Sequence, residues 1–190
     1  MSAAPKPAFA TTFDGARLPI LALPQGELLT LNVHEVPNVR STLGPGTSVQ
    51  LLRLDPEAGR WVVMVTMAPG AEVPIHYHTG TAEVYTLQGR WIYKEYPDQP
   101  QIAGSYLFEP GGSVHTLTVP EDNPEDTVML VMVTGANVNF SEDGSFHSVV
   151  DAVSLQYLLA KFAREQAVEL RYIGSSAAGF TEMEQTCERS

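Results

Sequence analysis

Residues 70–89 read Gly70-Ala-Glu-Val-Pro-Ile-His-Tyr-His-Thr-Gly-Thr-Ala-Glu-Val-Tyr-Thr-Leu-Gln-Gly89. Within this stretch His76 and His78 stand two residues apart, with Pro74 before them and Gly80 after them. Side chains two positions apart on a β-strand project from the same face. Both imidazoles are therefore expected to converge on one ion in the interior of a β-structure.

A second motif supplies one more histidine. It reads Gly104-x5-Pro110-x-Gly112-x2-His115, in which Pro110 to Gly112 predict a sharp turn before a strand that carries His115. Three imidazoles with a carboxylate nearby form a donor set that suits Fe, Mn, Ni, Zn or Cu. The sequence therefore predicts a metal site but does not identify the metal.

The pattern around these motifs is that of an all-β protein. Prolines and glycines interrupt the chain every few residues from about residue 18 to residue 144, and the runs between them are rich in Val, Leu, Thr and Tyr. Residues 55–59 and the pair Gln88-Gly89 are predicted to be hairpin turns. Eight or more short strands indicate a barrel or a sandwich. The expected strands include 47–54, 60–67, 83–87, 90–95, 105–108 and 128–133.

Near Asp151 the periodicity changes. Apolar residues recur at spacings of three and four, with no proline or glycine from Asp151 to Ile173, which predicts an amphipathic helix. Its apolar stripe is expected to pack on its own barrel, with a contact to another subunit as the alternative. The expected domains are a flexible tail over 1–12, a barrel over 13–150, a helical extension over 151–175 and a second flexible tail over 176–190.

Composition narrows the possible partners. The chain has 190 residues, of which 44% are hydrophobic and 17% charged, as in a globular protein. Its 22 acidic and 11 basic residues give a formal charge of −11, which disfavours nucleic acid and anionic membranes. The single cysteine, Cys187, and an N-terminus unlike a signal peptide favour a cytoplasmic protein. Apolar surface on the helix and the N-terminal strands is expected to support a homodimer or homotetramer.

The two histidine motifs resemble the paired signatures of the cupin superfamily. This resemblance implies a single-domain jelly-roll barrel, a double-stranded β-helix, whose metal is held by His76, His78 and His115. Glu83 occupies the cupin position for a carboxylate ligand. The chain departs from the pattern at Val119, where asparagine is usual, and by one residue fewer between Glu83 and Gly89; neither departure touches a histidine.

Residues 90–98, Arg-Trp-Ile-Tyr-Lys-Glu-Tyr-Pro-Asp, and residues 103–117 carry a closer resemblance. They are similar to the 2,4'-dihydroxyacetophenone dioxygenase family, and the similarity extends from about residue 43 to residue 174. It implies a mononuclear non-haem Fe(II) enzyme that takes an aromatic ketone and dioxygen. Such an enzyme cleaves the bond between the carbonyl and hydroxymethyl carbons, which yields an aromatic carboxylate and formate.

The choice of carboxylate stays open between two residues. If Gln88-Gly89 is a hairpin turn, Glu95 lies opposite Glu83, so one can ligate while the other accepts a proton. We expect Glu83 to ligate and Glu95 to be catalytic.

Glu109 is expected to be a solvated loop charge, and His34 and His147 to be structural or exposed. By strand alternation, the predicted substrate-binding wall is Tyr85, Trp91 and Tyr93, with ordinary core packing as the alternative.

Two other functional classes compete with this interpretation. A cupin enzyme acting on a β-diketone or a flavonol, or an isomerase, would keep the same metal site. A non-enzymatic metal-binding sensor would keep the site without turnover. Oxygen uptake separates the dioxygenases from the isomerase and the sensor.

Overall fold

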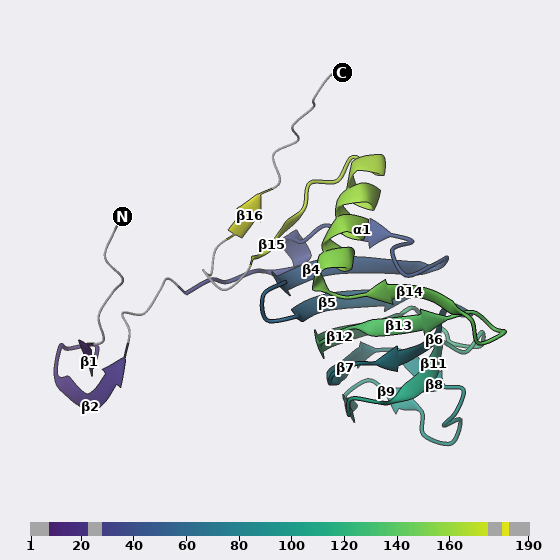
Figure 1. Cartoon of the computed structure of the whole chain (residues 1–190), viewed down its shortest axis with the longest axis horizontal. Helices are drawn as coiled ribbons and strands as arrows, with labels where there is room; N and C mark the ends of the chain where they lie inside the picture. Colours follow the sequence, from purple (N-terminus) through teal and green to yellow (C-terminus); the bar gives the residue numbers. More distant parts are fainter. Residues whose placement is uncertain (1–7, 23–27, 175–179, 183–190) are drawn as a thin grey trace. The chain divides into compact units, whose positions relative to one another are not determined.

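The computed structural model describes residues 8–22, 28–174 and 180–182. The chain divides into two compact units, Met1–Thr30 and Leu31–Ser190. In the first unit, β1 (Ala8–Thr11) and β2 (Arg17–Ala22) pair antiparallel. The second unit, which holds the predicted metal ligands, contains the remaining strands and the helix (Figure 1).

The second unit is built from two β-sheets. The first has eight strands, in the order β10-β7-β12-β5-β4-β15-β16, with β3 also paired to β4. Its strands are β3 (Val39–Arg40), β4 (Thr47–Asp55), β5 (Arg60–Met67), β7 (Ala82–Gln88), β10 (Tyr106–Glu109), β12 (Thr127–Thr134), β15 (Arg171–Ile173) and β16 (Phe180–Glu182).

The second sheet has six strands, in the order β14-β13-β6-β11-β8-β9. A short 3-10 helix, Val33–Glu35, precedes the sheets. The strands of the second sheet are β6 (Glu72–His78), β8 (Arg90–Tyr93), β9 (Gln101–Ile102), β11 (Val114–Thr118), β13 (Asn137–Phe140) and β14 (Phe146–Val150).

The all-β class with a C-terminal helix is confirmed, but the closed barrel is not. In the part of the chain that the structure describes, no strand pairing joins the two sheets to each other. The core lies between them, filled by the buried faces of strands such as β5, whose alternate residues are buried. The second unit is therefore a sandwich of two β-sheets.

The first predicted hairpin is confirmed and the second is wrong. β4 and β5 pair antiparallel around the turn at residues 55–59. β7, in contrast, pairs with β10 and β12, whereas β8 pairs with β11 and β9. Between them Gly89 has a φ of 75°, and a Cβ there would lie 2.7 Å from Oγ1 of Thr127. The chain thus passes from one sheet to the other at a corner where only glycine fits.

The helix is shorter than predicted. α1 spans Ala152–Glu165, and its N-terminus is capped by Asp151, which accepts a hydrogen bond from the Ser154 backbone. It ends where Ala167 adopts a φ of 53°, and β15 then pairs in parallel with β4. The predicted extension to residue 175 is wrong because Arg171–Ile173 adds to a sheet edge instead. α1 packs on β3, β4 and β14, as expected for a helix that covers its own sheets.

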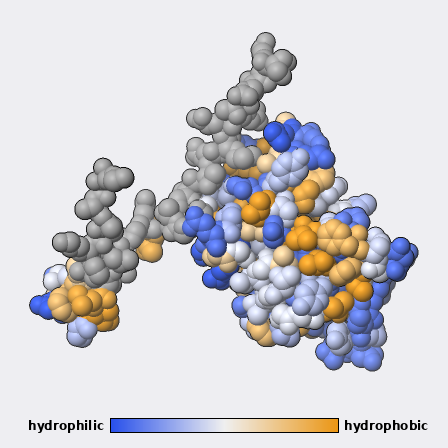
Figure 2. Space-filling view, in the orientation of Figure 1, coloured by the Kyte–Doolittle hydropathy of each residue, from blue (hydrophilic) through white to orange (hydrophobic). Residues whose placement is uncertain are grey.

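Other predictions concern the chain ends and the surface. Most of the two predicted tails, and Cys187, lie outside the described residues; residues 8–11 and 180–182 are strands. Within the described ranges, no helix is long and apolar enough to cross a membrane. Figure 2 shows apolar side chains gathered over β14, where Phe146 and Val149 are exposed.

Candidate metal centre

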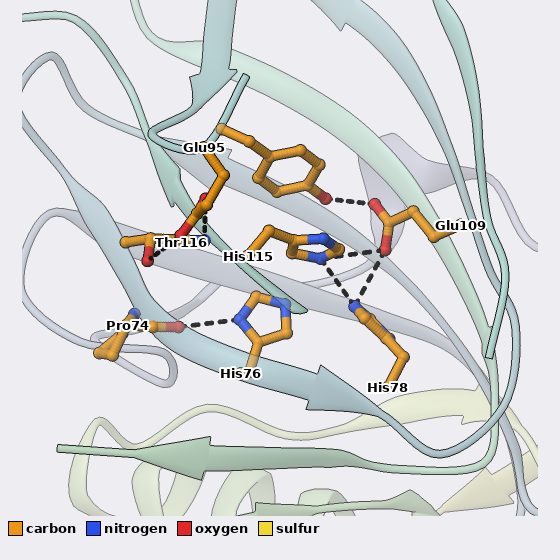
Figure 3. Close-up of polar contacts among 8 residues, drawn as sticks. Pro74, His76, His78, Glu95, Glu109, His115 and Thr116 are labelled. Atoms are coloured by element: carbon orange, nitrogen blue, oxygen red, sulfur yellow. Dashed lines mark hydrogen bonds and ion pairs between the residues drawn. The ribbon is translucent and has the colours of Figure 1, made fainter. Parts of the chain in front are cut away.

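Three histidines converge between the two sheets. β6 carries His76 and His78, and β11 carries His115 in register directly opposite His76. All three side chains are buried, and their ligand atoms lie within 4.8 Å of one another. Figure 3 shows the three imidazoles pointing toward a common point. The structure therefore brings together the three histidines that the spacing predicts.

A fourth donor comes from the other sheet. Glu109, the last residue of β10, places Oε2 at 2.9 Å from Nε2 of His78 and 3.4 Å from Nε2 of His115. Its side chain is only 5% exposed, so the expectation of a solvated loop charge is wrong. Because β10 and β6 belong to different sheets, the cluster depends on how the two sheets pack.

The spacing of the donor atoms fits a metal ion. Nε2 of His78 lies 3.0 Å from Nε2 of His115. The distances from these two nitrogens to Oε2 of Glu109, 2.9 Å and 3.4 Å, are similar. Ligands about 2.1 Å from a metal lie roughly 3.0 Å apart at right angles and about 3.4 Å apart at tetrahedral angles. Imidazole nitrogens and one carboxylate oxygen suit Fe(II), Zn(II), Mn(II) or Ni(II). The donors therefore fit a mononuclear divalent metal site.

A backbone contact fixes the protonation of His76. Its Nδ1 donates a hydrogen bond of 2.8 Å to the carbonyl oxygen of Pro74, which leaves Nε2 as a lone-pair donor facing the cluster. Burial lowers the pKa of His76 to about 4. At neutral pH the ring is therefore uncharged, in the form and orientation that binds a metal.

Tyr93 holds the carboxylate of Glu109 by a hydrogen bond. Its hydroxyl donates to Oε1 of Glu109. Burial raises the pKa of Tyr93 well above its ordinary value, so the hydroxyl stays a donor. Burial alone would raise the pKa of Glu109, but hydrogen bonds from His115, His78 and Tyr93 lower it well below its usual range. An ionised carboxylate is thereby held inside the protein.

The cluster opens on a cavity of about 470 Å³ with mainly apolar walls. His76, His78 and Glu109 are among the residues that line it. Both sheets and α1 contribute apolar side chains to the wall, among them Val65, Met67, Val84, Met129, Leu158 and Phe162. Polar groups come from β13 and β14: Asn137, Asn139, His147 and Ser148. The cavity can therefore hold a small, largely apolar molecule against His76, His78 and Glu109.

The structure does not bring Glu83 to the histidines. On β7 the buried face consists of Ala82, Val84 and Thr86, and Glu83 lies on the opposite face. Its carboxylate accepts a hydrogen bond of 2.8 Å from the hydroxyl of exposed Tyr106. Strand alternation thus turns Glu83 away from the interior, and Glu109 occupies the place expected for it.

Glu95 lies close to the site but faces a different group. Its carboxylate accepts hydrogen bonds from the backbone N–H of Thr116 at 2.8 Å and from the Thr116 hydroxyl at 3.0 Å (Figure 3). Burial opposes the ionised form of Glu95, but these hydrogen bonds lower its pKa below the ordinary value. Glu95 therefore stays ionised while fixing β11 next to His115.

The predicted aromatic wall divides into three different roles. Trp91 is fully buried in the core, where its Nε1 donates to Oγ1 of Thr86 at 2.9 Å. Tyr85 is 41% exposed on the outer face of β7. Tyr93 contacts the metal cluster through Glu109 and His115. None of the three is among the described residues that line the cavity, so their prediction as its wall is wrong.

The two remaining histidines are exposed, as expected, although His147 also lines the cavity. Glu109 is the site residue that the sequence reasoning missed. Glu109 stands directly before Pro110, at the end of a strand of four residues. So short a strand has too little periodicity to show which way its side chain points. The signal that could have identified it is its place inside the second histidine motif.

Comparison with known proteins agrees with this fold and site. A family model described as ChrR Cupin-like domain matches residues 28–138, which is more than half of the chain. The chain therefore belongs to the cupin family. No curated protein matches it.

Solved structures share the fold. A protein of unknown function with a cupin-like fold from Ralstonia eutropha JMP134 is 40% identical, with a TM-score of 0.75 over 82% of this chain and 96% of that one. An RmlC-like cupin protein from the same organism is 23% identical, with a TM-score of 0.68 over 76% and 92%. An acetylacetone dioxygenase from Acinetobacter johnsonii is 18% identical, with a TM-score of 0.61 over 74% and 95%. At these lower identities the last two show the fold alone.

Proposed function

We propose that this cupin is a mononuclear Fe(II) dioxygenase that cleaves the C–C bond of an aryl hydroxymethyl ketone, such as 2,4'-dihydroxyacetophenone, to an aromatic carboxylate and formate. The observation that carries the proposal is the cluster of His76, His78, His115 and Glu109 at the end of an apolar cavity of about 470 Å³. The resemblance of residues 90–117 to the family of that activity supports the choice of substrate.

The four clustered side chains would hold the metal. Bound Fe(II) would supply a Lewis acid for the substrate oxygens and the redox chemistry that activates dioxygen. The three imidazoles would contribute neutral donors and Glu109 a negative charge, and Glu109 would keep its hydrogen bond from Tyr93. This leaves one net positive charge on the centre, which favours binding of an ionised hydroxyketone.

The cavity would position the rest of the substrate. Its wall is mainly apolar, so it would exclude water and accommodate an aromatic ring. Glu109 is the one carboxylate among the described residues that line the cavity. Its two oxygens are engaged, Oε2 beside the imidazoles and Oε1 by Tyr93, so Glu109 would serve as a metal ligand and not as the acceptor of the substrate proton.

Two alternatives share the site. The structural neighbour named as an acetylacetone dioxygenase makes a β-diketone the main competing substrate. A sensor without turnover would use the same donors for metal binding alone. Oxygen uptake with a panel of hydroxyketones and β-diketones separates the proposed activity from both alternatives.

The test is oxygen consumption by the anaerobically purified, Fe(II)-loaded protein. With 2,4'-dihydroxyacetophenone we expect oxygen uptake with equal amounts of aromatic acid and formate. The methyl ether of the hydroxymethyl group should be inert, because it cannot lose the proton. Glu95→Gln should retain most of the rate, whereas Glu109→Gln should lose it. Uptake with a β-diketone only, or none with any substrate despite tight metal binding, would overturn the proposal.

A further inference from the structure

Three buried side-chain atoms have no hydrogen-bond partner in the described part of the chain: Nδ1 of His78, Oδ1 of Asn137 and Oγ of Ser113. His78 and Asn137 line the cavity, whereas Ser113 is not among its described lining residues. Buried polar groups are nearly always paired in native proteins, so each unpaired atom needs an explanation. The His78 and Asn137 atoms are complementary, and one explanation covers both.

Register places the two residues together. β13 pairs antiparallel with β6, and Asn137 lies directly opposite His78. Residues directly opposite on antiparallel strands share a face, with Cβ atoms about 4.5–5.5 Å apart. Both side chains line the cavity, which agrees with that placement. The Asn137 and His78 side chains are therefore neighbours on the cavity face of the two strands.

The chemistry of the two atoms matches. Nε2 of His78 faces Glu109 and His115, so in a neutral ring that ligates through Nε2 the proton is on Nδ1. Nδ1 is then a hydrogen-bond donor, and the amide oxygen of Asn137 is an acceptor. Neither atom bonds to the other in this structure.

The neighbouring pair along the same two strands gives a direct comparison. Asn139 lies opposite His76, just as Asn137 lies opposite His78. Yet Nδ1 of His76 already bonds to the Pro74 carbonyl, and the amide of Asn139 already donates to Oγ of Ser148 at 3.0 Å. One pair is satisfied by other partners, and the other pair is not.

We propose that Asn137 is the positioning residue for His78: when the metal is bound, its amide oxygen accepts the Nδ1–H of His78 and fixes that ring. The inference rests on the proposed metal site. Ligating histidines commonly donate their second ring N–H to such an acceptor, and removal of the acceptor typically lowers metal affinity by about 10- to 100-fold.

The test is Zn(II) affinity, measured by chelator competition on the full chain. Asn137→Leu, which keeps the approximate size but removes the acceptor, should weaken binding by about 10- to 100-fold. Asn137→Asp, which keeps an acceptor oxygen, should stay within a few-fold of the wild type. Asn139→Leu is the matched control and should also stay within a few-fold. Equal affinity of Asn137→Leu and the wild type, or an equal loss in both leucine variants, would overturn the proposal.

A second measurement covers the case in which Asn137→Leu does not fold. In the Zn(II)-loaded wild type, the Nδ1 proton of His78 should appear by NMR as a slowly exchanging signal close to the Asn137 side chain. A rapidly exchanging proton, or one near a different acceptor, would refute the pairing. If the wild type binds no metal at all, it is the proposed function that fails; if it binds metal and these contrasts are absent, only the Asn137 proposal fails.

Discussion

The ring of Tyr93 stacks on the imidazole of His115, with centroids 3.8 Å apart and planes inclined by 20°. The same tyrosine donates its hydroxyl to Glu109. One side chain thus holds a histidine by its face and the carboxylate by a hydrogen bond. Tyr93 therefore connects β8, β10 and β11 around the cluster.

Tyr93→Phe should separate these two contacts, because it keeps the ring but removes the hydroxyl that donates to Oε1 of the buried Glu109 carboxylate. We expect the metal-free protein to lose about 1–3 kcal/mol of unfolding free energy in urea. Zn(II) affinity should fall by roughly tenfold, as for other lost outer partners of a metal ligand. Tyr85→Phe, on the outer face, is the control. No difference between the two variants would show that the hydroxyl contact contributes nothing.

Paired variants test whether Glu109, and not the predicted Glu83, is the carboxylate ligand. Glu109→Gln should retain the fold but bind substantially less metal at limiting concentration, since the anionic ligand is gone. Glu83→Gln should keep the metal content of the wild type, because its carboxylate bonds to Tyr106 on the outside. Elemental analysis after dialysis measures both. Loss of metal in the Glu83 variant alone would restore the cupin-motif assignment.

Capping of α1 predicts a pH-dependent contribution to stability. The backbone N–H of Ser154 lowers the pKa of Asp151 below its ordinary value, so the ionised cap stabilises the folded state. Asp151→Ala should cost about 1 kcal/mol at pH 7. Because the folded pKa is the lower one, this difference should persist above the unfolded pKa and shrink as the pH falls through the folded pKa. Chemical unfolding of both proteins at several pH values tests it; a difference that grows on acidification would contradict the sign.

Association of the chain remains a prediction from its apolar surface. Several large apolar side chains are exposed on the outer face of β7 and β10: Tyr85, Leu87, Tyr106 and Phe108. Two copies that cover such a surface would form a symmetric dimer. Sedimentation at micromolar concentration should give at least twice the chain mass of 20.7 kDa. A species of the chain mass alone would show that this surface stays open.

The histidines and the strand class could be predicted because their signals are local. The spacing of His76 and His78 fixes a shared face, and the turn before His115 fixes where its strand starts. Strand pairing is not local, and the error about Glu95 came from there. A hairpin at Gly89 would have placed Glu95 opposite Glu83, but the close contact with Thr127 belongs to a residue far along the chain.

The position of Glu109 could not be predicted for the same reason. Its carboxylate enters the site because β10 joins the first sheet while the histidines stand on the second. No pattern within residues 104–115 specifies which sheet faces which. The helix end was missed for a similar reason, since Arg171–Ile173 is recruited by β4, more than a hundred residues earlier in the chain.

The central claim is that His76, His78, His115 and Glu109 form one metal centre. The most direct measurement is the Fe(II) content of the anaerobically loaded wild type beside His76→Ala, His78→Ala and His115→Ala, with His147→Ala as an exposed control. We predict one iron per chain in the wild type and the control, and loss of most of it in each of the three variants, all retaining a β-rich circular dichroism spectrum. Full iron occupancy in any of the three would contradict the assignment of that histidine and of the centre built on it.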